Sequence, residues 1–169
     1  MKMRAAILNG TLGELSVETI EIGDPRPGEV RVKIAASGLC HTDWETMHGF
    51  QPINLPAIIG HERAGVVDAV GPGVTRVKVG DHVVCSWSPN CGHCFYCDQG
   101  QPILCETARE ANANGVLFDG TTRMSRNGER STTTASSLRT PSITLFRNRP
   151  RCPYPKISRS TAPRCWAAP

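Results

Sequence analysis

The sequence is poor in aromatic residues and has no long apolar run. Phe, Trp and Tyr make up 5% of its 169 residues. No stretch approaches the ~20 consecutive apolar residues that a membrane-spanning helix requires, so we expect no membrane partner. The apolar run at residues 5–8 is too short for a secretory signal peptide. We therefore expect a cytoplasmic protein whose thiols stay reduced.

Acidic residues are missing from the last part of the chain. Residues 130–169 contain eight Lys/Arg and no Asp or Glu, whereas residues 1–129 contain 11 Lys/Arg and 15 Asp/Glu. The last part is also rich in Pro, Ser and Thr, a composition that buries little and favours disorder. We expect a folded domain over residues 1–129 and a disordered basic tail over 130–169. Without a recognition motif in the tail, we expect no nucleic acid partner.

A dinucleotide-binding fingerprint is also lacking. Gly71 and Gly73 are spaced as the first two glycines of that motif, but Arg76 occupies the position of the third. No strand–helix–strand pattern surrounds them. We therefore expect no nucleotide-binding domain among these residues.

What the sequence does contain is a dense group of cysteines. Cys91, Cys94 and Cys97 are separated by two residues each, and Cys105 follows eight residues later. Two-residue gaps let neighbouring thiolates surround one ion, and a longer loop returns the fourth ligand of a tetrahedral zinc site. The spacing favours one zinc ion. Spacing alone leaves three alternatives open: two disulfides, an iron–sulfur cluster and four separate buried thiols. Reduced thiols would not form the disulfides.

The rest of the folded part is predicted to form short strands between Gly/Pro turns. Alternating or continuous apolar residues predict strands at residues 3–8, 15–22, 29–34, 57–70 and 82–85. The first two form a hairpin. Thr42 is predicted to cap a short helix that ends near Gly49, residues 106–113 to form one or two helical turns, and residues 114–129 to form a loop. This pattern predicts a mainly β barrel or sandwich that carries a zinc loop.

Other potential ligands are isolated in the sequence. Cys40 and His61 lie 21 residues apart, and such a pair by itself is more often coincidence than a site. Cys85, on an apolar strand, is expected to be a small buried hydrophobic residue. We expect His48, His82 and His93 to be surface or hydrogen-bonded residues and not ligands.

Three motifs together resemble one enzyme family. The segment Gly-His-Glu-Arg-Ala-Gly at residues 60–65, followed by Gly71 and Val74, is similar to that of the zinc-containing alcohol dehydrogenases of the medium-chain dehydrogenase superfamily. Cys-His-Thr-Asp at residues 40–43 resembles the segment with their first catalytic zinc ligand, and the four clustered cysteines resemble their structural zinc lobe. The resemblance covers residues 1–129. It implies a GroES-like, partly open β barrel, and zinc, not iron, at the four cysteines.

The resemblance also implies a reaction. That family oxidises a primary alcohol, or a hydroxymethyl adduct of a thiol, and passes hydride to NAD. Glu45 stands where many relatives carry a histidine that passes the proton to solvent. The roles implied for the matching residues are catalytic zinc ligands (Cys40, His61), acceptor of the alcohol proton (Thr42), orientation of the zinc-bound histidine (Asp43), approach to the metal during ligand exchange (Glu62) and contact with the cofactor pyrophosphate (His41).

Parts of the family pattern have no counterpart in this sequence. The third catalytic zinc ligand, a cysteine, and the nucleotide-binding domain are missing, and Cys152 and Cys165 match nothing. The resemblance, the acidic residues and the apolar periodicity all stop together, which suggests a reading-frame change near Arg130. We expect a dehydrogenase fragment that has only two catalytic zinc ligands and is inactive alone. The alternative is a small zinc-binding interaction module whose basic tail contacts nucleic acid or another acidic partner.

Overall fold

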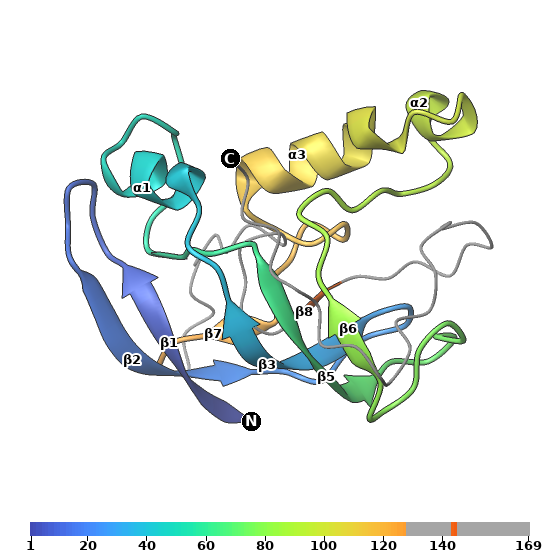
Figure 1. Cartoon of the computed structure of the whole chain (residues 1–169), viewed down its shortest axis with the longest axis horizontal. Coiled ribbons are helices and arrows are strands. Elements are labelled where there is room, and N and C mark those ends of the chain that lie inside the picture. The colour runs from blue at the N-terminus through green and yellow to red at the C-terminus, as the bar shows by residue number, and fades with distance from the viewer. Residues whose placement is uncertain (128–142, 145–169) are drawn as a thin grey trace.

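The computed structural model describes residues 1–127 and the backbone of residues 143–144. Within these residues, the strands form two four-stranded antiparallel sheets, in the orders β4-β1-β2-β7 and β6-β5-β3-β8. The sheets curl into the partly open barrel that the family resemblance implied (Figure 1). The strands are β1 (Lys2–Leu8), β2 (Leu15–Ile22), β3 (Val30–Ser37), β4 (Ala57–Ile58), β5 (Arg63–Val70), β6 (His82–Val84), β7 (Met124–Ser125) and β8 (Ile143–Thr144).

The predicted hairpin is confirmed as β1 and β2. The strands pair from Lys2↔Glu21 to Leu8↔Leu15, and Leu12, with φ of 59°, helps to reverse the chain between them. Alternation places one set of side chains on the inner face of the sheet. That set forms a buried cluster with residues from β4 and β7: Ala5, Ile7, Ile20, Ile22, Ile58 and Met124.

The second sheet is built on the pairing of β3 with β5. Val30, Val32 and Val67 form its buried cluster, and the register shifts between Ile34 and Ala36. Next to this irregularity, a Cβ on Gly65 would lie 2.2 Å from the carbonyl oxygen of Lys33. Only glycine therefore allows the two backbones to approach so closely.

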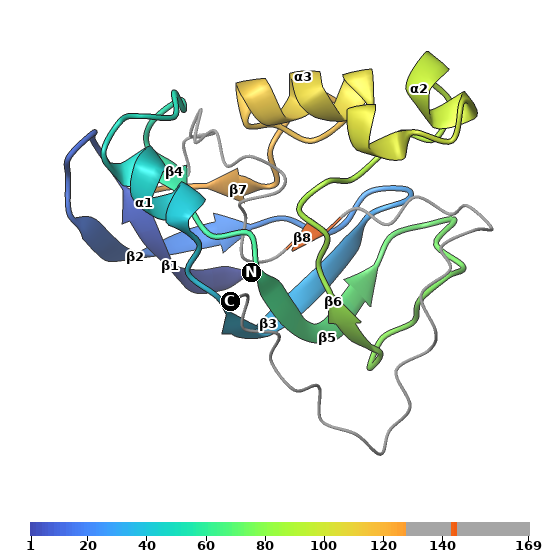
Figure 2. The same cartoon turned by 45° about the horizontal axis from the view of Figure 1, so that its top comes forward.

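The helices lie on one side of the strands in both views (Figures 1 and 2). They are α1 (His41–Met47), α2 (Phe95–Asp98), a 3₁₀ turn η1 (Pro102–Leu104) and α3 (Glu106–Asn114). The prediction that Thr42 caps the first helix is wrong. The N-cap is Cys40, whose N–H donates to Asp43 Oδ2 at 3.0 Å. Among the described residues, no helix is both long and apolar enough to cross a membrane.

The predicted loop at residues 114–129 is only partly correct. Met124 and Ser125 pair with β2 as β7, a strand too short to show any periodicity. Most of the predicted tail, residues 130–169, lies outside the described residues, so the prediction of disorder there stays a prediction. Within it, Ile143–Thr144 pairs with the start of β3 as β8.

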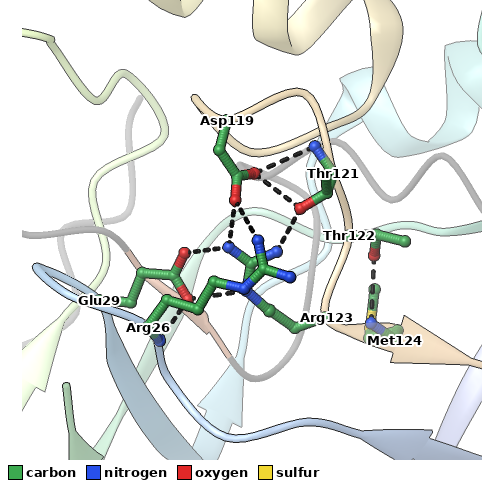
Figure 3. Close-up of polar contacts among 7 residues, drawn as sticks. All are labelled: Arg26, Glu29, Asp119, Thr121, Thr122, Arg123 and Met124. Carbon is green, nitrogen blue, oxygen red and sulfur yellow. Dashed lines mark hydrogen bonds and ion pairs between the residues drawn. The ribbon is translucent and has the colours of Figure 1, made fainter.

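A buried ion-pair cluster attaches the segment after α3 to the barrel (Figure 3). Arg123 Nε donates to Glu29 Oε2 at 3.0 Å, and the two side chains are only 4% and 7% exposed. Asp119 accepts from Arg123 and, at 2.9 Å, from Arg26. Burial acts to raise the pKa of Asp119, but hydrogen bonds from Arg123 and Thr121 outweigh it and hold that pKa at about 2. We call Arg26, Glu29, Asp119 and Arg123 the Arg123 cluster.

Candidate metal centres

The four clustered cysteines converge on one point. Their Sγ atoms all lie within 4.8 Å of one another, and those of Cys94 and Cys105 are 3.9 Å apart. Four thiolates at about 2.3 Å from a tetrahedral metal would be roughly 3.8 Å apart. All four cysteines are free thiols. The geometry therefore fits the predicted zinc site and excludes both four separate thiols and two disulfides in this structure.

Short helical turns build this cysteine lobe, which comprises residues 91–114. Cys94 is the N-cap of α2 and Cys105 the N-cap of α3. Cys105 Sγ accepts N–H groups from Cys91 at 3.2 Å and from Ala108 at 3.4 Å. Cys91 Sγ accepts from the N–H of His93 at 3.5 Å. Such donors stabilise the thiolate form, which is the form that binds a metal.

The surroundings of these thiols give them different pKa values. Burial acts to raise the pKa of Cys91, but the donors around it, His93 first, bring that pKa down to about 6. Burial raises the pKa of Cys97 to about 12. At neutral pH, Cys97 thus carries a proton that a bound metal would displace.

A second group of donors lies where β3 ends and β5 begins. One ligand atom from each of Cys40, His61 and Glu62 lies within 4.8 Å of the others. The pairing of Ser37 with Arg63 brings the ends of the two strands side by side, and the N–H of Gly38 donates to the carbonyl of Glu62 at 2.7 Å. Sheet register thus brings together residues that are distant in sequence.

Gly38 leaves room for the carboxylate in this second group. A Cβ at position 38 would lie 2.2 Å from Glu62 Oε2 and 3.1 Å from Glu62 Cβ. Any larger residue at position 38 would push the Glu62 side chain away. The family resemblance placed Glu62 near this metal. Sequence reasoning missed Gly38, whose only signal was a glycine two residues before Cys40.

Asp43 supports the second group from within the protein. Its side chain is 0% exposed and accepts N–H groups from Cys40 at 3.0 Å and Gly60 at 3.1 Å. Asp43 Oδ1 also lies 3.5 Å from His61 Nδ1. A carboxylate at Nδ1 orients an imidazole so that Nε2 is left for a metal.

The other predicted site residues occupy two different environments. Thr42 Oγ1 is 3.7 Å from Cys40 Sγ, so Thr42 belongs to the second group. His41 is exposed on α1, 3.8 Å from the Glu45 carboxylate, and it stacks on Trp44. His48, His82 and His93 are exposed and Cys85 is buried, as the sequence predicted.

The chain belongs to the alcohol dehydrogenase GroES-like domain family, whose model matches residues 26–134. It is 45% identical over 130 residues to the S-(hydroxymethyl)glutathione dehydrogenase of Aspergillus oryzae, an alignment that covers 76% of this chain and 34% of that enzyme. The predicted family is confirmed, and the chain spans about a third of the length of the curated relatives that it matches.

Solved structures agree with this assignment. The fold matches an alcohol dehydrogenase zinc-binding domain protein from Burkholderia ambifaria with a TM-score of 0.75 and 36% identity, over 86% of this chain and 40% of the other. It matches benzyl alcohol dehydrogenase from Acinetobacter calcoaceticus with a TM-score of 0.74 and 33% identity, over 86% of this chain and 39% of the other. The chain therefore matches the N-terminal part of these relatives.

Proposed function

We propose that this chain is the metal-binding part of the catalytic domain of a zinc- and NAD-dependent alcohol dehydrogenase. The observation that carries the proposal is the convergence of Cys40, His61 and Glu62 within 4.8 Å. We assign these three residues to a catalytic zinc. Three protein donors with an open position are typical of catalytic zinc sites, so Glu62 supplies the third donor where two were expected. The four cysteines of the lobe are assigned to a structural zinc.

The remaining residues have separate parts in this proposal. When bound, zinc supplies a Lewis acid that stabilises a substrate alkoxide. Thr42 accepts the alcohol proton, which must leave before hydride can. Asp43 fixes the orientation of His61 through Nδ1, and exposed His41 is available to the phosphates of a cofactor. By similarity to its relatives, the substrate is a primary alcohol or a hydroxymethyl adduct of a thiol.

Hydride transfer is not expected from the chain alone. The sequence has no glycine-rich turn of the kind that holds a dinucleotide at a helix N-terminus. We expect no NAD reduction by the purified chain with ethanol, or with formaldehyde plus glutathione. Measurable turnover under either condition would show that these residues form a working enzyme.

Cobalt substitution tests the two metal assignments. Thiolate-to-cobalt charge-transfer bands should develop until two Co²⁺ ions are bound per chain. The variant Cys40→Ala should retain one ion, because the lobe is untouched. The matched control Cys85→Ala removes a buried thiol outside both groups and should bind two. Saturation of the unmodified chain at one ion would reject the catalytic site.

A second candidate function rests on the charge contrast between residues 1–129 and the acid-free residues 130–169. In this alternative the lobe is a scaffold and the basic segment binds a polyanion. Binding to phosphates falls steeply as salt rises. A fluorescent DNA or RNA oligonucleotide that binds at ~50 mM salt and dissociates by ~200 mM would favour this alternative. No binding at low salt would exclude it.

A further inference from the structure

The helix α3 is poorly suited to stand by itself. Its nine residues, Glu-Thr-Ala-Arg-Glu-Ala-Asn-Ala-Asn, bury only Ala108 and Ala111. Isolated helices shorter than ~12–15 residues are marginal in water even when rich in alanine. The helix must therefore owe its order to contacts at its ends or along its small apolar face.

The contacts at its N-terminus are with the cysteines. Cys105 is the N-cap, and its Sγ accepts the N–H of Ala108 at 3.4 Å. The hydroxyl of Thr107 donates to the sulfur of Cys91, and the N–H of Glu106 donates to the sulfur of Cys94. Three successive residues of the first turn thus each donate to a different sulfur. All the acceptors belong to the group that fits a tetrahedral metal.

We propose that α3 and the metal at the four cysteines form a single cooperative unit, in which loss of the metal unfolds the helix. The inference rests on the proposed metal-binding role of the cysteines. A bound divalent metal would hold the four sulfurs in fixed positions, so that the groups of the first turn that donate to them keep their acceptors. The positive end of the helix dipole in turn stabilises the anionic cluster. Without the metal, nothing fixes the positions of the sulfurs to which the first turn donates.

The unit has a clear boundary at its other end. Gly115 ends α3 in a left-handed conformation, with φ of 67°. Beyond it, Asp119 and Arg123 are held to Arg26 and Glu29 by the Arg123 cluster. We therefore expect the effect of metal loss to stop between Gly115 and Asp119, and to leave the hairpin of β1 and β2 unchanged.

Amide hydrogen exchange on the full chain tests this inference. Zinc content is measured by mass spectrometry before and after treatment with a chelator, and exchange is followed in the same samples. Peptides that cover α3 should exchange on the order of 10-fold faster after the metal is removed, because local opening then costs less free energy. Peptides from β2 should not change. Unchanged exchange in α3 after complete metal loss would overturn the inference.

Three variants separate a metal effect from a capping effect. Cys97→Ser removes a ligand but leaves the Cys105 cap in place, and it should still expose α3 in the presence of zinc. If α3 stays protected in Cys97→Ser after its lobe metal is lost, the cap alone supports the helix and the inference fails. Thr107→Val should release lobe zinc faster than the unmodified chain, whereas Thr107→Ser, which keeps the hydroxyl, should not. A chain that never holds lobe zinc would instead refute the proposed function.

Discussion

The two donor groups differ in how the chain brings their members together. In the lobe, Cys91 and Cys105 are 14 residues apart, and short turns between them suffice to gather all four sulfurs. In the other group, Cys40 meets His61 and Glu62 only because β3 pairs with β5. The comparison teaches that a site local in sequence can be organised by its metal. A site assembled across a sheet can form only after the sheet does.

Removal of a lobe ligand should produce the largest effect, and the effect should be confined to the lobe. Structural zinc contributes an apparent ~10–16 kcal/mol in small zinc-binding peptides. Cys91→Ser, at a side chain that is 1% exposed, should reduce the metal content from two ions to one and expose the lobe to proteolysis. The Cys40 group should keep its metal. Loss of both ions in Cys91→Ser would show that the two groups are not independent.

The Arg123 cluster attaches the segment after the lobe to the barrel, and its disruption should have the second largest effect. Arg123→Met leaves Glu29 buried without its charged partner, and breaking a buried pair in this way costs about 3–5 kcal/mol. The matched control is Arg26→Met, since Arg26 makes an exposed pair with Asp119 and should cost about 0–1 kcal/mol. Urea unfolding at pH 7 measures both. Equal losses in the two variants would contradict the greater importance of the buried pair.

Gly38→Ala should weaken metal binding only at Cys40, His61 and Glu62, the group that depends on sheet pairing. The added methyl displaces the Glu62 carboxylate, one of the three proposed donors, and the affinity should fall at least as far as the ~10–100-fold that loss of a partner outside the ligands costs. Competitive titration with a metal indicator should show weaker binding at one site and no change at the lobe. Gly10→Ala, where a Cβ would meet nothing within 4 Å, is the control and should leave both affinities unchanged.

The smallest expected effect is a loss of stability in acid. The folded-state pKa of Asp119 is about 2, below the ~3.9 of an unperturbed Asp. A lowered folded pKa stabilises the protein above the unfolded pKa, and this contribution disappears as the pH falls from ~4 through 2. Asp119→Asn should therefore flatten the stability profile in that window. Because Asp119 is 39% exposed, solvent screening keeps the difference small. An unchanged profile would mean that Asp119 ionisation does not stabilise the fold.

Local patterns in the sequence predicted the features that depend on local interactions. The hairpin of β1 and β2 follows from its apolar residues and turn, and the lobe follows from cysteine spacing. By contrast, the pairing of Cys40 with His61 required a family resemblance, because no periodicity indicates which strands pair. The convergence of Glu62 depends on the register between Ser37 and Arg63, which single-chain patterns do not determine. The same limit applies to β7, a two-residue strand that exists only through its pairing with β2, and to the break of the predicted strand at 57–70 into β4 and β5.

The ion pair between Glu29 and Arg123 has a consequence for the order of events during synthesis. The two residues are 94 positions apart, so Glu29 leaves the ribosome long before its partner exists. At translation rates of ~5–20 residues per second, that interval is roughly 5–20 s. During this time β1, β2, β3 and β5 can already pair, while a carboxylate that ends up buried remains in water. The nascent barrel should therefore stay open at this edge until Arg123 emerges and closes it.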